Sequence, residues 1–390
     1  MTVTAPLVLL EPEDAIAWAP FHGARPICEL RAGLWRIRDR WEATLGVATS
    51  AILGDNNIGF HEIDAPESRL VEAVHGPLIV ARSDFAPAGT RMSLGPEVRR
   101  LTAGGITVAW IIPEGETWHA DLLGASQEVD GILLRGSFDL ITALEQLLEH
   151  DCADFLTGPT DPLPTQTIVL GDASRVRSSG AEVEPGVVFD VRHGVVVIDH
   201  GAEVGSGTRL EGPCYVGPGA RVLGGFIRGS ILGPRSVVRG EVSATIFNGY
   251  ANKGHDGFVG HSVIGHWVNL GAGTTTSNLK NTYGTVRLVV AGRTVDTGRQ
   301  FLGSLIGDHA KTAIGTMLPT GTVVGAGANV FGEGLGKYVP PFSWGASGDV
   351  QLTEEGFLRI AERVMPRRDV AVTAERRASL ISIFRRLSAR

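Results

Sequence analysis

The chain has 390 residues and a formal net charge of -7, with 43% apolar and 20% charged residues. These values are typical of a globular protein of about two domains, and the negative charge argues against a nucleic-acid partner. Glycine stands out, because its 52 residues are about twice the usual share of roughly 7%. Three separated cysteines, no long apolar run and no basic leader predict a cytoplasmic protein without membrane partners.

Residues 1–160 alternate short apolar runs with helical patterns. The runs PLVLLE, GPLIVARSD, GITVAWIIP and VDGILLRG are expected strands. Leu30, Leu34, Ile37 and Trp41 have helical spacing, and FDLITALEQLLEH carries a leucine stripe typical of a second helix. This alternation predicts an α/β domain with a mostly parallel sheet, which should end in the segment TGPTDPLPTQ.

Residues 161–345 repeat an apolar residue at every sixth position. The series is clearest from Ile198 to Val222 and from Ile306 to Val330. A period of six fits neither an amphipathic helix nor a simple strand, and it indicates a parallel β-helix with coils of about 18 residues. The apolar residues should stack inside the coils, with small residues and glycines at the corners. Residues 279–303 break the period and should form a loop or hairpin that leaves the coil.

The last segment, residues 346–390, has the pattern of two helices. Thr353 is the expected cap of the first and Pro366 its end, and Thr373 should cap the second. The nine arginines between 359 and 390 are typical of a solvated helix face, and the alternative is an anion site, for example for the phosphates of coenzyme A.

The stretch YANKGHDGFVGHSVIGHWVNLGAGTTTSNLKNTYG, from Tyr250 to Gly284, crowds His, Asn and Lys between apolar steps. These polar residues fall on outward or corner positions of the expected coils, which suits a binding cleft between neighbouring solenoids. A metal site is disfavoured, because His255 and His261 are one hexapeptide apart and should diverge.

With these motifs the chain resembles the bifunctional enzymes that make UDP-N-acetylglucosamine, in which a glucosamine-1-phosphate N-acetyltransferase is joined to an N-acetylglucosamine-1-phosphate uridylyltransferase. It resembles most a variant bacterial branch with an atypical N-terminal sugar-nucleotidyltransferase domain. The resemblance rests on ARPICELRAGLWRIRDRWE, on the polar stretch from Asn248, on TGRQFLGSLIGDHAKTAIGT and on PPFSWG.

This resemblance implies three parts. They are a nucleotidyltransferase-like α/β domain in residues 1–160, a left-handed parallel β-helix acyltransferase domain in 161–345 and a C-terminal helical tail in 346–390. It also implies a homotrimer with acetyl-transfer sites between subunits, for which Phe258 and Trp267 are candidate contacts.

Site residues follow from the resemblance one by one. His255 lies 14 residues before Asn269 in VNLGAGT, the family's spacing for the general base, and a His with a near-neutral pKa can take a proton from an attacking amine. His261 and His266 are expected to be structural. The other implied contacts are Asn269, Asn278 and Phe258 for the sugar phosphate, Ala272 for acetyl-CoA, and Lys253, Lys280 and Lys311 as substitutes for phosphate-binding cations, with Lys311 on the acetyl-CoA side.

The first domain departs from the wider family. The Gly-rich loop that cradles the triphosphate is missing, and EPEDAIAWAPFHGARP stands in its place. Phosphate would then be held by Arg25, Arg31 or the next helix N-terminus, and the alternative for both arginines is a surface charge. Nucleotidyl transfer would use Mg²⁺, for which the sequence offers only Asp84 and Asp139 as candidate ligands.

The expected function is therefore sugar-nucleotide biosynthesis from small molecules: acetyl-CoA-dependent N-acetylation of glucosamine 1-phosphate, and uridylyl transfer from UTP. One alternative is an acyltransferase for another amino sugar or sugar nucleotide with an inactive first domain. Another is a non-catalytic sugar-nucleotide-binding protein.

Overall fold

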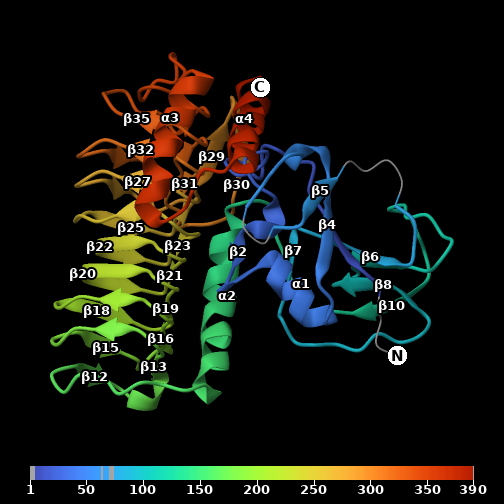
Figure 1. Ribbon diagram of the computed structural model, residues 1–390, viewed down its shortest axis with the longest axis horizontal. Helices are drawn as coiled ribbons and strands as arrows, with labels where there is room; N and C mark the ends of the chain where they lie inside the picture. Colours follow the sequence, from blue (N-terminus) through green and yellow to red (C-terminus); the bar gives the residue numbers. More distant parts are fainter. Residues whose placement is uncertain (1–4, 63–64, 70–73, 390) are drawn as a thin grey trace. The chain divides into compact units, whose positions relative to one another are not determined.

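The computed structural model describes residues 5–62, 65–69 and 74–389, and the chain divides into two compact units (Figure 1). The sheet unit holds the residues up to Trp18, His22–Gly136 and the chain from Thr373 onward. The solenoid unit holds Ala19–Phe21 and Ser137–Val372. Within the described ranges, no helix combines the length and apolar character needed to cross a membrane.

The sheet unit is built on a seven-stranded mixed sheet. The central strand β1 pairs in parallel with both β4 and β6, and β9 pairs antiparallel with β6 and β8. The expected strands at PLVLLE, GPLIVARSD and GITVAWIIP are confirmed as β1, β6 and β9. The strands lie in the order β10 (Ala125–Glu128), β8 (Val98–Ala103), β9 (Ile106–Ile112), β6 (Leu78–Arg82), β1 (Leu7–Leu10), β4 (Thr49–Leu53) and β5 (Glu67–Arg69).

Two smaller elements accompany this sheet. The expected strand in VDGILLRG is β11 (Gly131–Leu133), which pairs antiparallel with β7 (Phe85–Pro87) outside the main sheet. The expected helix over Leu30–Trp41 is partly wrong, because α1 spans Ile37–Leu45. Its first half instead forms the short antiparallel pair β2 (Arg31–Ala32) and β3 (Trp35–Arg36), which turns at Gly33 with a φ of 66°. The helical spacing was not decisive, because all four apolar residues are buried in the observed structure, as they would be on the inner face of a single helix.

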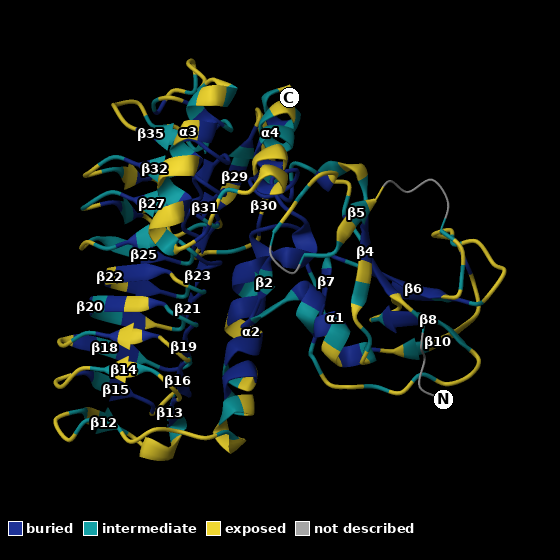
Figure 2. Cartoon of the chain, in the orientation of Figure 1, coloured by how far each residue is buried: buried dark blue, intermediate teal, exposed yellow. Residues whose placement is uncertain are grey.

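The solenoid unit is a stack of parallel coils, and each coil contributes strands to three faces. Exposed residues gather at the turns and buried residues along the strands (Figure 2). Face A consists of β14 (Glu182–Val183), β17 (Glu203–Val204), the first parts of β20 (Arg221–Arg228) and β22 (Val237–Ser243), β24 (Asn252–Lys253), β27 (Asn269–Leu270), β32 (Lys311–Thr312) and β35 (Asn329–Val330).

Face B follows face A in each coil. It consists of β12 (Ile168–Leu170), β15 (Val188–Asp190), β18 (Thr208–Glu211), the last parts of β20 and β22, β25 (Phe258–Gly260), and the pair β28 (Thr275–Thr276) and β33 (Met317–Leu318). Face C closes the coil with β13 (Val176–Ser178), β16 (Val196–Ile198), β19 (Cys214–Val216), β21 (Ile231–Leu232), β23 (Ile246–Phe247), β26 (Val263–Ile264), β31 (Leu305–Ile306), β34 (Val323–Val324) and β36 (Tyr338–Val339).

The period of six is confirmed as the inward column of this solenoid. Ile306, Leu318 and Val330 are at most 2% exposed and belong to one continuous apolar core. The inward-facing residue of each strand lies next to the inward-facing residue of the paired strand in the following coil. Each coil therefore covers the apolar side chains of the coil before it. The fold class is therefore an α/β sheet region followed by a parallel β-solenoid and C-terminal helices.

The leucine-rich helix belongs to the solenoid unit. It is α2 (Asp139–Ala153), and its Cys152 thiol lies 4.0 Å from the carbonyl oxygen of Cys214 in β19. The compact units thus divide near Gly136, upstream of the expected boundary at residue 160. A helical pattern shows that one face is apolar, but it does not show which neighbour that face meets.

The C-terminal helices form as expected but do not make one domain. Thr353 caps α3 (Glu354–Val364) by accepting a hydrogen bond from Gly356, and Thr373 caps α4 (Ala374–Ser388). The short helix η5 (Met365–Arg368) follows α3 in the solenoid unit, whereas α4 belongs to the sheet unit. There the Ser379 hydroxyl accepts from the backbone N–H of His61 at 3.0 Å.

The break in the repeat is confirmed as an insertion. It carries the antiparallel hairpin β29 (Arg287–Val290) and β30 (Arg293–Asp296) between Asn278 and the strand β31.

Candidate active site

His255 lies on the corner between β24 on face A and β25 on face B. Its side chain is exposed, and its imidazole has no hydrogen-bond partner within the described part of the chain. An exposed, unengaged imidazole is available to take a proton from a ligand, which the general-base role requires.

Ala272 lies on the same corner one coil further along. The backbone N–H of Gly273 donates to the carbonyl of Asp256 at 3.1 Å, and the N–H of Gly315 donates to the carbonyl of Ala272 at 2.7 Å. These bonds place residues 255 and 272 at equivalent turns, about 4.8 Å apart along the stack. The Ala272 N–H has no acceptor among the described residues and is therefore free to donate to a bound molecule.

Asn269 belongs to an outward row of polar residues on face A. Asn252, Asn269, Lys311 and Asn329 are register partners on successive coils. The amide nitrogen of Asn252 donates to the amide oxygen of Asn269 at 2.8 Å. Asn269 therefore has its acceptor engaged and keeps its NH₂ group for an acceptor on a ligand.

Lys253 faces inward, contrary to the expectation that it contacts the sugar phosphate. It pairs in register with Val238, and its side chain is 2% exposed. The ammonium donates to the carbonyl oxygens of Arg239 and His255, both at 2.8 Å. Burial lowers the pKa of Lys253 to about 8, although the carboxylate of Asp256 opposes the shift. This lysine fastens the corner that carries His255 from inside the coil.

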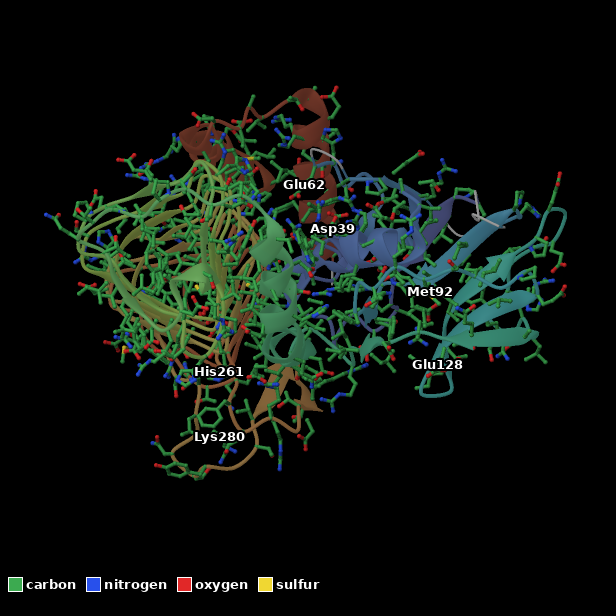
Figure 3. All side chains as sticks on the ribbon, turned by 90° about the horizontal axis from the view of Figure 1, so that it is seen from below. Asp39, Glu62, Met92, Glu128, His261 and Lys280 are labelled. Atoms are coloured by element: carbon green, nitrogen blue, oxygen red, sulfur yellow. The ribbon has the colours of Figure 1, made fainter. Side chains whose placement is uncertain are left out.

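The other two lysines are also bonded to backbone carbonyls. The Lys311 ammonium donates to Trp267 at 3.1 Å and to His309 at 3.0 Å, and burial lowers its pKa to about 8. Lys280 donates to the carbonyl of Thr285 at 3.0 Å on the insertion, away from the stacked strands (Figure 3). None of the three substitute cations is therefore presented as a free phosphate ligand.

Asn278 lies at the corner between faces B and C, next to His261, for which the sequence predicted a structural role. The Asn278 amide nitrogen lies 2.8 Å from Nδ1 of His261, whose ring stacks on Phe301 at 5.3 Å. Burial lowers the pKa of His261, with a smaller opposing effect from Glu145, whose carboxylate is 3.9 Å away. The sequence signal for this contact is the spacing: Asn278 follows His261 by seventeen positions, which places the two residues on successive coils.

Phe258 lies on the outer side of face B, where it flanks the close approach at Gly260. A Cβ on Gly260 would lie 2.4 Å from the Phe258 ring and 2.8 Å from the amide nitrogen of Asn278. The absence of a side chain at Gly260 therefore lets Phe258 and Asn278 come together.

Trp267 is not an exposed contact for another subunit. It is 5% exposed and stacks on Tyr250 with a centroid distance of 4.4 Å, while His309 lies 6.1 Å away on its other neighbouring coil. The three rings occupy equivalent corner positions with positive φ, so they form one internal column. On the coil after Ala272, Ile314 and Met317 are exposed apolar residues, at 80% and 68% exposure.

The two arginines expected to hold phosphate in the sheet unit are engaged internally. Arg25 is 1% exposed and forms an ion pair of 2.8 Å with Glu62, and Arg31 donates to the carbonyl of Leu34 at 2.5 Å. The N-terminus of the next helix, α1, is also occupied, because the Asp39 carboxylate accepts from the backbone N–H of Arg36 at 3.2 Å. Nearby in the chain, the Glu11 carboxylate accepts from the backbone N–H of Ile27 at 2.8 Å. Burial raises the pKa of Glu11 to about 7.

The residues offered for Mg²⁺ do not fit a metal site. Both carboxylate oxygens of Asp84 pair with Arg82, at 2.7 and 2.6 Å, and Asp139 is a buried residue of α2. Among the described residues, no group of three or more His, Cys, Asp or Glu side chains is arranged to hold a metal.

Comparisons with known proteins agree with the two-part layout. No model of a known protein family matches the chain. A bifunctional sugar-1-phosphate nucleotidylyltransferase/acetyltransferase of Sulfurisphaera tokodaii is 34% identical over 147 residues, which is 35% of each chain. Two proteins named bifunctional protein GlmU are also similar. That of Jannaschia sp. is 28% identical over 62% of this chain and 50% of its own. That of Azoarcus sp. is 26% identical over 63% of this chain and 57% of its own.

The chain spans between about a third and somewhat more than half of the length of these curated relatives. The chain is thus similar, at modest sequence identity, to proteins named bifunctional sugar-1-phosphate nucleotidylyltransferase/acetyltransferase and GlmU, and its β-solenoid is consistent with that similarity.

Proposed function

We propose that the solenoid unit transfers an acetyl group from acetyl-CoA to the amine of glucosamine 1-phosphate. The observation that carries this proposal is the exposed, unengaged imidazole of His255 beside the free N–H of Ala272. A base and an oxyanion donor one coil apart are the two groups that acyl transfer needs.

In this mechanism the neutral amine of the substrate attacks the thioester carbonyl, and His255 takes a proton from its nitrogen as the carbon–nitrogen bond forms. The Ala272 N–H donates to the oxygen that gains negative charge in the tetrahedral intermediate. When the intermediate collapses, the carbon–sulfur bond breaks, and the protonated His255 can return its proton to the leaving thiolate. Asn269, held by Asn252, offers its NH₂ group to an oxygen of the sugar phosphate.

We also propose a homotrimer, because one solenoid surface provides only part of a cleft. The support is the exposed apolar pair Ile314 and Met317, which lies on the coil after Ala272. Exposed apolar residues beside a polar site are typical of a surface that a second copy covers. Light scattering of the purified protein should give about three times the chain mass of 41.3 kDa.

Uridylyl transfer from UTP is the less supported half of the proposal. The name of one relative gives sugar-1-phosphate nucleotidylyl transfer without naming the nucleotide. The internal pairing of Arg25 and Asp84 gives no phosphate or Mg²⁺ site in the residues that the sequence offered.

The test incubates the full chain with acetyl-CoA, UTP and Mg²⁺ and with glucosamine 1-phosphate or, in parallel reactions, other amino sugars, followed by mass analysis of the products. N-acetylglucosamine 1-phosphate without a UDP-sugar would mean that only the solenoid is active. Acetylation of a different amino sugar would replace glucosamine 1-phosphate as the proposed substrate. The absence of product with every amino sugar tested would favour the alternative of a non-catalytic sugar-nucleotide-binding protein.

A further inference from the structure

The short helix η5 places a guanidinium over the polar row of face A. Arg368 ends η5, and its main-chain carbonyl accepts from Arg235 at 3.1 Å. Arg235 also pairs with Asp369 at 2.7 Å, so two bonds hold this segment on the solenoid. From there, the Arg368 Nη2 reaches to 3.5 Å from the amide oxygen of Asn252, at the limit of a hydrogen bond.

Arg368 differs from Arg221 and Arg235 in its charge balance. Arg221 pairs with Glu203 at 2.7 Å, and Arg235 pairs with Asp369. No carboxylate in the described part of the chain pairs with Arg368, and its Nε is buried without an acceptor. Burial lowers the pKa of Arg368, and the positive charges of Arg367 and Arg221 add to this effect. A bound anion would supply both the missing acceptor and the missing negative charge.

The amides beside Arg368 are oriented for the same kind of ligand. Asn252 turns its oxygen toward Arg368 and donates its nitrogen to the oxygen of Asn269. Asn269 is left with an NH₂ group, which is a donor. Guanidinium and amide N–H groups along one face are what a phosphate, with acceptor oxygens only, can bind.

The lysines give no competing site on this part of the solenoid. Lys253 and Lys311 each donate to two backbone carbonyls, and Lys280 donates to a carbonyl on the insertion. We propose that Arg368, with the amide pair Asn252 and Asn269, forms the subsite for the phosphate group of the sugar 1-phosphate. This inference rests on the proposed function for its substrate, but its anion chemistry does not depend on acetyl transfer.

The experiment measures binding of glucosamine 1-phosphate to the full chain by calorimetry. Arg368→Gln should weaken binding about 10- to 100-fold, because a charge-assisted hydrogen bond is lost. Arg368→Lys should recover only part of the affinity, since it restores the charge without the planar fork. Arg363→Gln is the matched control: it removes the same charge from the exposed surface of α3 and should leave binding unchanged.

A second set of probes separates the sources of phosphate and the two proposals. Inorganic pyrophosphate should bind the wild type more tightly than Arg368→Gln by a similar factor, even if the protein acetylates nothing. In that event the subsite stands and the proposed function fails. Equal affinity of wild type and Arg368→Gln for both the sugar phosphate and pyrophosphate would overturn the inference. A loss of coenzyme A affinity alone would also overturn it, because Arg368 would then serve the acetyl donor.

Discussion

The ammonium of Lys253 and the main-chain carbonyl of His255 are joined by a hydrogen bond of 2.8 Å inside the solenoid. His255, the proposed general base, therefore lies on an exposed corner whose backbone is bonded from the inside by the buried ammonium of Lys253. The second acceptor of this ammonium, the carbonyl of Arg239, belongs to the preceding coil, so the bond also ties two coils together.

His255→Ala should lower kcat for acetyl transfer by about 10²- to 10⁴-fold, because it removes general-base catalysis. The melting temperature should stay close to that of the wild type, since the imidazole is exposed and makes no internal hydrogen bond. Steady-state kinetics and thermal unfolding measure the two quantities. His193→Ala, at another exposed histidine of the solenoid, should change neither. Full activity of His255→Ala would remove this residue from the mechanism.

Lys253→Met should leave the fold intact but reduce kcat about threefold to thirtyfold, because two charge-assisted hydrogen bonds no longer hold the corner. The stability difference between the variant and the wild type should depend on pH. The wild type should gain stability relative to the variant as the pH rises from about 8 to 10.5, by about 3 kcal/mol.

The sign of that change follows from proton binding. Between those pH values the unfolded chain keeps its Lys253 proton, whereas the folded chain, with its lowered pKa, has lost it. Urea unfolding at several pH values measures the difference. Lys280→Met, at the lysine that donates to the Thr285 carbonyl on the insertion, serves as the control, and a pH-independent difference for Lys253→Met would show that the ammonium is not buried in solution.

Glu11→Gln should stabilise the sheet unit increasingly as the pH rises from about 4.5 to 7. Burial raises the pKa of Glu11 to about 7, so the folded wild type holds a proton that the unfolded chain releases in this range. The wild type therefore loses about 3 kcal/mol of stability across that window, and the neutral glutamine does not. Urea unfolding of both proteins at pH 4.5, 6 and 8 measures the effect, and parallel curves would contradict the burial of a carboxylate at this strand end.

Gly260→Ala should destabilise the solenoid by about 1–3 kcal/mol, because its Cβ would overlap the Phe258 ring and the amide of Asn278. The substitution should also raise the KM of a substrate that contacts Asn278. Gly336→Ala is a suitable control, since its Cβ would meet nothing closer than 4.0 Å. An unchanged KM would show that Asn278 does not contact the substrate.

The sequence alone determined the parts of this fold that follow from periodicity. An apolar residue at every sixth position can bury its side chain only if the strands stack as coils, so Ile306, Leu318 and Val330 were predictable as core. Helix caps were predictable for a similar local reason: the hydroxyls of Thr353 and Thr373 bond to backbone N–H groups only three positions away. The exposed corner position of His255 follows from the same register.

Only the tertiary structure decided what lies between distant segments. Lys253 occupies an inward position that the pattern reserves for apolar residues, and its bonds to two carbonyls allow this. Arg25 and Glu62 pair across 37 positions of the sequence, so no local signal distinguished a buried ion pair from a phosphate ligand. Arg368 reaches Asn252 across 116 positions. Periodicity determines whether a residue faces the inside or the outside of its own coil. Its partner from a distant segment depends on the three-dimensional path of the chain, which no local pattern encodes.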